Sequence, residues 1–334
     1  MRIRLATTVA TLGAALFTHP GTASAATDAF DLQAHRGGRA LVVENTIPAF
    51  ANALELGVTT LELDIQITRD GREVVGHDAR VDEAKCTDTA PVSAGDKQYP
   101  YVGKLIKDLT FEQVRTLDCG SKTQSAYPGQ QAAPGAKMPT LAEVFALAAD
   151  RGADTVRFSI ELKNDPVGET TAGRGQFVQQ ALHEIRSAGV EDRAVIQSFD
   201  WGTLELVHQT DPTVPLYALT DITKVYPLSP WTGGLNLIWE SESLVRGAKS
   251  IGATALSPIH AVPPEGRLQM PVISQRLVDT AHEHGILLVP WTVNEPEAMR
   301  KLIDKGVDGI ITDYPDRLRE VMREQGLPLP GERD

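Results

Sequence analysis

The chain has 334 residues with a formal net charge of −12, and apolar residues make up 42% of it. This length fits one large α/β domain, or two smaller domains, with a sizeable core. An acidic surface repels polyanions and anionic membranes at long range, so we expect no nucleic-acid partner. A small anionic substrate would need a local pocket of positive charge.

The N-terminal segment has the three parts of a secretory signal peptide. Residues 1–4 include two arginines, Arg2 and Arg4, residues 5–17 are mostly apolar, and Ala23-Ser24-Ala25 matches a cleavage site. The apolar run is shorter than the roughly 20 residues that span a bilayer, so a stable membrane anchor is the weaker interpretation. We therefore predict that residues 1–25 are removed near Ala25-Ala26 and that the mature protein is secreted.

From residue 31 onward, strand-like and helical segments alternate along the chain. The strand-like segments are 31–35, 61–67, 73–77, 157–163, 194–199, 216–220, 253–257, 287–293 and 309–313. The main helical segments are 47–56, 141–149, 175–187, 204–209, 275–284 and 296–305. Such alternation is typical of a parallel sheet with crossover helices.

One connection is too short for a parallel crossover. Only Thr68-Arg69-Asp70-Gly71 separates the second strand-like segment from the third, whereas a crossover needs a dozen or more residues. Asp-Gly between two such segments indicates an antiparallel hairpin. Without this arm eight parallel strands remain, which predicts an irregular (β/α)₈ TIM barrel over residues 28–320. A doubly wound open sheet is the alternative, but no Gly-rich loop follows the first strand to support it.

Residues 79–137 are rich in Pro, Gly, Ser, Asp and Lys, and we interpret them as a loop-rich insertion in the barrel. They contain the two cysteines of the chain, Cys86 and Cys119. In an exported protein such a pair most simply forms one disulfide, and two buried free thiols are the alternative. A short helix is expected near 109–117, and residues 321–334 are expected to form a flexible tail.

The segment 61–67 alternates apolar and polar side chains, so Glu62, Asp64 and Gln66 share one face of a strand. In a barrel this face can point inward. Two neighbouring carboxylates repel each other unless a positive charge lies between them, and a hard divalent cation with oxygen ligands meets that need. A solvated acidic face on an edge strand is the alternative.

The hairpin places His77 relative to these acids. With a two-residue Asp70-Gly71 turn, Asp64 pairs with His77; with a four-residue loop, Glu62 pairs with His77. Either register puts His77 on the face of the two acids, and only a bulge of an odd number of residues would turn it away.

Two further segments carry candidate site residues. Glu161 and Lys163 share a face at the end of a later strand, where barrel active sites lie, and a lysine there suits an anionic substrate. A surface Glu–Lys pair is the alternative. His35-Arg36 follow the first strand, and an arginine at that place suits bidentate binding of phosphate.

These residues occur within an ordered set of motifs: His35-Arg36-Gly37, Glu44-Asn45-Thr46, Glu62 with Asp64, Asp70-Gly71, His77-Asp78, Pro139-Thr140-Leu141-Ala142-Glu143, Glu161-Leu162-Lys163, Gln197-Ser198-Phe199-Asp200, Val289-Pro290-Trp291-Thr292-Val293-Asn294 and Gly309-Ile310-Ile311-Thr312-Asp313-Tyr314-Pro315. The set resembles the glycerophosphodiester phosphodiesterase family over nearly the whole mature chain. The chain departs from the family at Val43, where a proline is common, and at residues 82–86, where an Arg-Thr-Thr run is common.

The resemblance implies a (β/α)₈ barrel that hydrolyses glycerophosphodiesters to an alcohol and sn-glycerol 3-phosphate. It implies one divalent metal ion, Ca²⁺ or Mg²⁺, held by Glu62, Asp64 and Glu161. The other implied roles are an acid–base pair of His35 and His77, phosphate binding by Arg36 and Lys163, a pocket wall at Trp291, and support of the site by Glu44 and Asn45.

Two other functions fit the sequence less well. A phospholipase-type phosphodiesterase acting on intact lipid would need an apolar rim, and the candidates are Trp231, Leu235, Leu237, Ile238 and Trp239. We favour buried packing for this cluster. A secreted phosphodiester-binding protein without turnover would have little use for two histidines beside three acids.

Overall fold

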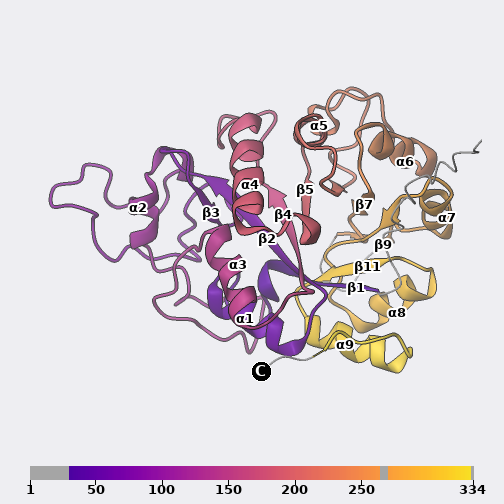
Figure 1. The fold of residues 1–334 in the computed structure, drawn as a ribbon, viewed down its shortest axis with the longest axis horizontal. Coiled ribbons are helices and arrows are strands. Elements are labelled where there is room, and N and C mark those ends of the chain that lie inside the picture. The colour runs from indigo at the N-terminus through magenta and orange to yellow at the C-terminus, as the bar shows by residue number, and fades with distance from the viewer. Residues whose placement is uncertain (1–29, 264–269, 332–334) are drawn as a thin grey trace, which may run out of the picture.

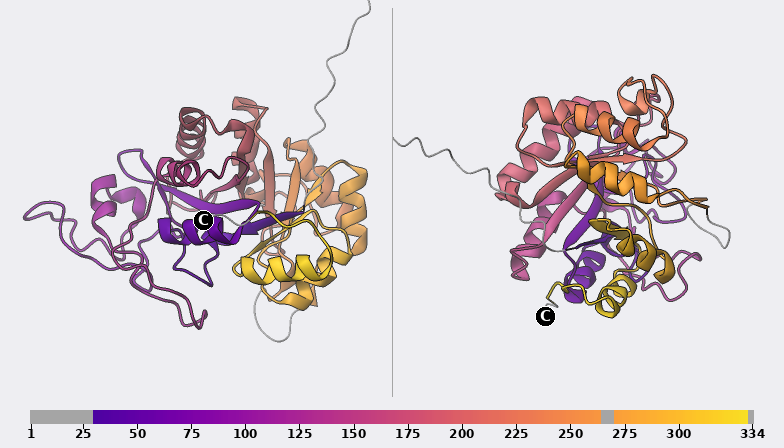
Figure 2. Two further views of the ribbon diagram at one scale, coloured as in Figure 1. Left: turned by 60° about the horizontal axis from the view of Figure 1, so that its bottom comes forward. Right: turned by 90° about the vertical axis from the view of Figure 1, so that its right-hand side faces the viewer.

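The computed structural model describes residues 30–263 and 270–331, so the predicted signal peptide lies outside the described residues. Eight strands follow one another in the order β10-β7-β6-β5-β4-β2-β1-β11, and every neighbouring pair is parallel. Their bounds are β1 (Asp31–Ala34), β2 (Thr60–Ile67), β4 (Arg157–Leu162), β5 (Ala194–Ser198), β6 (Leu216–Thr220), β7 (Ala255–Pro258), β10 (Leu287–Leu288) and β11 (Gly309–Thr312). The predicted TIM-like barrel is confirmed (Figures 1 and 2).

The two end strands of this order, β10 and β11, approach each other through irregular backbone. Asp308 donates its N–H to Leu288 O at 3.0 Å, and Ile311 donates to Pro290 O at 3.0 Å. The strand predicted at 287–293 is therefore regular only at its start, although its later residues still meet β11. The barrel is nearly closed.

Helices lie outside the strands and cover the barrel (Figure 2). Their bounds are α1 (Ile47–Leu56), α3 (Leu141–Asp150), α4 (Arg174–Ala188), α5 (Trp201–Thr210), α6 (Ser241–Ser250), α7 (Gln275–Glu283), α8 (Pro296–Asp304) and α9 (Pro315–Glu324). None of the helices in the described ranges is long and apolar enough to cross a membrane. Helix α9 includes residues 321–324, so the expected C-terminal tail can begin only after it.

Local signals in the sequence explain where α1 and α3 begin and end. Thr46 caps α1 by accepting a hydrogen bond from Ala49 N, and Thr140 and Glu143 form a capping box at the start of α3. Gly57 ends α1 with φ of +75°, a conformation that costs a residue with a side chain about 1 kcal/mol or more.

The two faces of β2 point where the alternation predicts. Leu61, Leu63, Ile65 and Ile67 are buried in the main core between the barrel and its helices. Glu62, Asp64 and Gln66 are also buried, on the opposite, inward face. Elsewhere the barrel interior holds a separate apolar cluster of Val195, Tyr217, Ala255, Val289 and Ile311, so charge is concentrated on one side of the interior.

The hairpin arm is antiparallel as predicted, but both predicted registers are wrong. Strand β3 (Glu73–Val75) pairs Glu73 with Ile67 and Val75 with Ile65, so five residues, 68–72, form the connection. Continued regularly, this register would place His77 opposite Leu63 on the outer face. The strand ends at Val75 instead, Gly76 N donates to Asp64 O at 2.9 Å, and the chain then turns His77 into the interior pocket.

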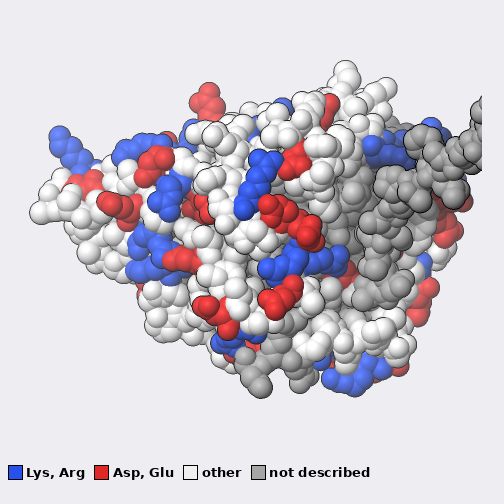
Figure 3. All heavy atoms as spheres, viewed as in Figure 1, with Lys and Arg blue, Asp and Glu red and all other residues white. Residues whose placement is uncertain are grey.

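The insertion, residues 79–137, projects from one side of the barrel (left in Figure 1, and in the left view of Figure 2). It contains the short helices η2 (Ile106–Asp108) and α2 (Phe111–Thr116) and its own apolar cluster around Tyr101, Leu109 and Leu117. Cys86 and Cys119 belong to this cluster and form the predicted disulfide. Acidic and basic side chains lie beside one another over the insertion on the face seen in Figure 3.

The remaining short elements lie in connections. They are η1 (His35–Gly37), η3 (Glu191–Arg193), η4 (Pro230–Thr232) and the antiparallel pair β8 (Ala261–Val262) and β9 (Met270–Pro271). Of these, η1 carries site residues and η4 borders the interior pocket.

Replacing both cysteines with serine should lower the free energy of unfolding by about 3–4 kcal/mol, because the bond closes a long loop in the unfolded chain. Urea unfolding of the C86S/C119S variant and of the unreduced wild type measures this difference. Thiol titration of the denatured, unreduced wild type should find no free thiol. Two free thiols, or equal unfolding energies, would contradict the prediction.

Candidate active site

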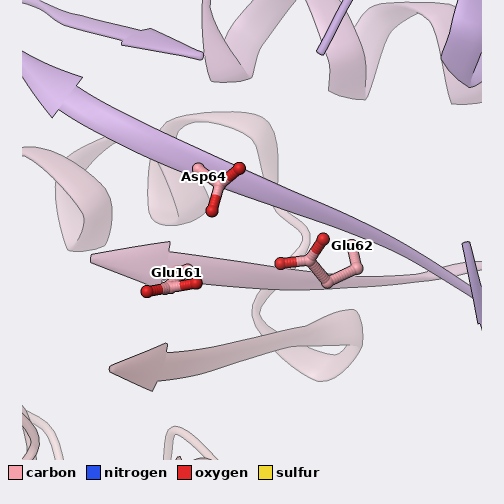
Figure 4. A group of neighbouring side chains, drawn as sticks. All are labelled: Glu62, Asp64 and Glu161. Carbon is pink, nitrogen blue, oxygen red and sulfur yellow. The ribbon is translucent and has the colours of Figure 1, made fainter. Parts of the chain in front are cut away.

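Three buried carboxylates from two adjacent strands meet inside the barrel (Figure 4). Glu62 and Asp64 lie on β2, Glu161 lies on β4, and the register pairs Asp64 directly with Glu161. One oxygen from each residue lies within 4.8 Å of the others. Burial raises the pKa of Glu62 well above its usual value, and the charges of Asp64 and Glu161 raise it further. Burial likewise raises the pKa of Glu161, to about 7, against the opposing effect of Lys163.

This donor set fits a divalent cation. Asp64 Oδ1 is buried and accepts no hydrogen bond from any described residue, and Lys163 Nζ lies 3.8 Å away from it. Clustered carboxylate oxygens with unused lone pairs are the ligands that Ca²⁺ and Mg²⁺ prefer. A cation here would also relieve the repulsion that raises the pKa of Glu62.

Arg36 supplies positive charge to the cluster from the other side. Its backbone N–H donates to Glu62 Oε2 at 2.8 Å, its Nε lies 3.2 Å from Asp64 Oδ2, and its NH1 donates to Glu44 Oε1 at 3.0 Å. Burial alone would raise the pKa of Asp64, but Arg36 in particular holds it well below its usual range. Asp64 is therefore ionised, and Arg36 is held by carboxylates on two sides.

The backbone around Arg36 is strained in a way that the site requires. Arg36 has φ of +52° and Asn45 has φ of +54°, and such conformations cost of order 1–3 kcal/mol each. Asn45 N donates to Arg36 O at 3.0 Å, and Asn45 Nδ2 donates to Asp64 Oδ2 at 2.9 Å. Position 38 requires glycine, because a Cβ there would lie only 2.9 Å from the ring of Pro315.

His35 is oriented by an aspartate from the far end of the sequence. Its Nδ1 lies 2.5 Å from Asp313 Oδ1, and its Nε2 lies 4.0 Å from Glu62 Oε2. The pKa of Asp313 is lowered to about 2, because His35 and Arg39 outweigh the effect of burial. An ionised carboxylate only accepts hydrogen bonds, so Nδ1 of His35 carries the proton and Nε2 is left to exchange one.

His77, which follows β3 and also lines the pocket, has a similar arrangement. Its Nδ1 lies 2.8 Å from Asp78 Oδ1. Burial would raise the pKa of Asp78, but His77 and Lys85 hold it well below its usual value. Burial, Lys163 and Arg36 lower the pKa of His77 to about 4. The neutral imidazole therefore presents Nε2 as its proton acceptor.

One pocket of about 590 Å³ is lined by both histidines and by two of the three acids, Glu62 and Glu161, whereas Asp64 does not reach its wall. The predicted site residues that line it are His35, Arg36, Glu62, His77, Glu161, Lys163 and Trp291. Lys163 Nζ lies 2.8 Å from Glu161 Oε1. The ring of Trp291 packs edge-on against Phe199 with centroids 5.2 Å apart, which gives the pocket an aromatic wall. Glu44 and Asn45 lie behind the pocket, where they contact Arg36 and Asp64.

Several residues of the site were not predicted from the sequence. Asp313 binds His35, and it also accepts hydrogen bonds from Tyr127 at 2.9 Å and Asn294 at 2.8 Å. Gln197 Nε2 donates to Glu62 Oε1 at 2.7 Å. Asp313, Asn294 and Gln197 all lie within the family motifs, which could have identified them, whereas Tyr127 lies in the insertion without such a signal.

Comparison with known proteins gives a consistent result. Residues 35–317 match the Glycerophosphoryl diester phosphodiesterase family. A glycerophosphodiester phosphodiesterase of Caldanaerobacter subterraneus is 32% identical over 293 residues, covering 88% of this chain and 98% of that protein. A solved structure from Silicibacter pomeroyi, assigned to the glycerophosphoryl diester phosphodiesterases, has 29% identity and a TM-score of 0.74, covering 90% of this chain and 96% of that one.

A more distant structure shares the fold. An Oleispira antarctica phosphodiesterase, solved in complex with the product sn-glycerol-3-phosphate, has 17% identity and a TM-score of 0.64, covering 87% of this chain and 96% of that one. The chain forms a parallel barrel, and one interior pocket holds buried acids and two histidines that are each bound by an aspartate. This fold and site define an enzyme of the (β/α)₈ barrel class. The chain belongs to the glycerophosphodiester phosphodiesterase family, and it is a phosphoric diester hydrolase.

Asp313→Asn should lower kcat about 10²–10⁴-fold, the range that general acid–base catalysis contributes, because His35 loses the carboxylate that orients it. Asp308→Asn is a matched control, since Asp308 binds His282 at 2.9 Å at the other end of β11. Steady-state hydrolysis of a glycerophosphodiester measures both variants. Equal rates in the two variants would show that Asp313 does not act on His35.

Proposed function

We propose that the enzyme hydrolyses glycerophosphodiesters to an alcohol and sn-glycerol 3-phosphate in a metal-dependent reaction with two histidines as acid and base. The observation that carries this proposal is one pocket lined by two imidazoles, each with its Nδ1 bound by an aspartate, beside three buried acids. The Oleispira phosphodiesterase, which holds sn-glycerol-3-phosphate as its product, supports the same product here.

The proposed reaction has two steps, and the substrate supplies the first nucleophile. One histidine takes the proton of the glycerol hydroxyl next to the phosphate, that oxygen attacks phosphorus, and the other histidine protonates the departing alcohol oxygen. Water then opens the cyclic phosphate with the two roles reversed. His35 and His77 come from different strands, which suits attack and departure on opposite sides of phosphorus.

Cations around the pocket would stabilise the developing negative charge. Arg36 and Lys163 line the pocket, and their charged groups are held in place by Glu44, Asp64 and Glu161. Fixed donors of this kind need little reorganisation when charge develops on the phosphoryl oxygens. Glu62, Asp64 and Glu161 would hold the metal ion, which would supply Lewis-acid stabilisation of the same oxygens.

The lipid-acting alternative has less support. Leu237 is buried, Leu235 and Trp239 are partly buried against the main core, and Trp231 lines the pocket, so most of the candidate apolar rim is packed against the protein. Ile238 is the exposed member, at 56%. This favours soluble glycerophosphodiesters over intact lipid as substrates.

Export of the enzyme is also proposed. Disulfides persist in oxidising compartments and are rare in the cytosol, and the Cys86–Cys119 bond therefore agrees with the signal peptide that the first 25 residues predict.

Glu62→Gln, Asp64→Asn and Glu161→Gln should each weaken metal binding and abolish most turnover, because each removes one negatively charged oxygen ligand. Metal content after dialysis and activity with and without chelator measure the effect. Glu73→Gln is a control with a buried acid on β3, outside the cluster. Full activity in chelator, or unchanged metal content in all three variants, would refute metal dependence.

A substrate analogue without the hydroxyl next to the phosphate should turn over very slowly, because the proposed nucleophile is missing. His35→Ala and His77→Ala should each lower the rate of hydrolysis roughly 10²–10⁴-fold. The double variant should lose less than the product of the two single losses, because the two residues act together. An activated leaving group such as nitrophenol should partly rescue only the variant that lacks the general acid.

His282→Ala serves as the control, since this histidine binds Asp308 away from the pocket. Hydrolysis of the deoxy analogue at the normal rate would contradict internal attack and would indicate direct attack of water on phosphorus.

A further inference from the structure

The insertion contributes a charged side chain to the support of the active site. Lys85 lies beside Cys86, and its Nζ lies 2.8 Å from Glu44 Oε1 and 2.6 Å from Asp78 Oδ2. Lys85 does not line the substrate pocket, and it contacts the site through these two carboxylates. Burial alone would lower the pKa of Lys85, but Glu44 and Asp78 raise it, and the side chain stays charged.

The two carboxylates belong to different parts of the site. Glu44 Oε1 also accepts from Arg36 NH1 at 3.0 Å, which links Lys85 to the residue that contacts Asp64. Asp78 uses its other oxygen, Oδ1, to bind His77 Nδ1. The ammonium of Lys85 therefore joins the Arg36 side of the site to the His77 side.

The disulfide fixes the position of Lys85. Cys86 is joined to Cys119, and its backbone oxygen accepts a hydrogen bond from Lys122 Nζ at 3.0 Å. A small cavity of about 30 Å³ lies directly between the cross-link and the site. Its walls include Glu44, Asn45, His77, Asp78, Lys85, Cys86 and Cys119. The cross-linked segment thus abuts the residues that Lys85 holds.

Asp78 depends on this contact more than Glu44 does. The side chain of Glu44 is 5% exposed and also has Arg36 and Arg39 as partners. The side chain of Asp78 is 35% exposed, so without Lys85 its carboxylate can rotate toward water and take His77 with it. A histidine that must transfer a proton in a fixed direction is sensitive to such a change.

We propose that Lys85 is a positioning residue for the reaction, which holds Asp78 and thereby His77 in place and ties them to Glu44 and Arg36. This inference rests on the proposed function. It assigns to the insertion a part in turnover, in addition to its own packing.

The test compares Lys85→Met with Lys85→Arg, and uses Lys97→Met as a control for an exposed lysine of the same insertion. Glycerophosphocholine is the probe, and release of glycerol 3-phosphate is followed. We expect Lys85→Met to lower kcat about 10- to 100-fold, as loss of a supporting contact commonly does, with KM changed by less than about twofold. Lys85→Arg should recover most of the loss, and Lys97→Met should match the wild type.

A double change tests the route through Asp78. If Lys85 acts through that carboxylate, Lys85→Met combined with Asp78→Asn should have nearly the kcat of Asp78→Asn alone. Losses that multiply would overturn this route. Thermal unfolding of each variant identifies any loss of fold. If Lys85→Met is unfolded, Lys85→Gln replaces it; this side chain keeps N–H donors but lacks the positive charge, and it should show an intermediate kcat.

Among the single variants, three results would overturn the inference: a wild-type kcat in the Lys85 variant, a rise in KM alone, or an equal loss in Lys97→Met. Failure of the proposed function is distinguishable from these, because the wild type itself would then release no glycerol 3-phosphate.

Discussion

The guanidinium of Arg36 lies between Glu44 and Asp64 while its backbone N–H binds Glu62, and the charge arrangement of the barrel interior depends on this contact. Three carboxylates in a buried space repel one another, and burial of each ion costs several kcal/mol before any partner is found. Arg36 offsets part of that cost from one side and Lys163 offsets part from the other. The left-handed backbone at Arg36 is the strain that this geometry requires.

The two histidines are supported by different parts of the structure. His35 is held by Asp313, which follows the last barrel strand and is itself bound by Asn294. His77 is held by Asp78, whose second oxygen is bound by the insertion through Lys85. The insertion also reaches the first pair, since Tyr127 donates to Asp313. The barrel therefore fixes the acids, and the two histidines depend on the barrel and the insertion together.

Local patterns in the sequence predicted most of the barrel, because each strand and most helices carry their own periodicity and end signals. The alternation over residues 61–67 correctly placed Glu62 and Asp64 on the inward face. The hairpin register was wrong because a connection of five residues shifts the pairing by one, which turn residues alone did not reveal. Helices α6 and α9 were not among the main predicted helical segments. Contacts such as His35 with Asp313 join residues 278 positions apart and leave no local pattern.

The separate apolar cluster of the insertion has a consequence for how the enzyme loses activity on heating. Its buried residues, among them Tyr101, Leu109 and Cys119, form a core separate from the main core, which only Val74 of β3 and Met138 join from outside the insertion. A unit with its own small core can open locally at a lower free energy than the whole domain. Such an opening would withdraw Lys85 and Tyr127 while the strands that carry the acids stay paired. Thermal inactivation would then precede the unfolding of the barrel and reverse on cooling, and the disulfide would limit how far the opened segment departs.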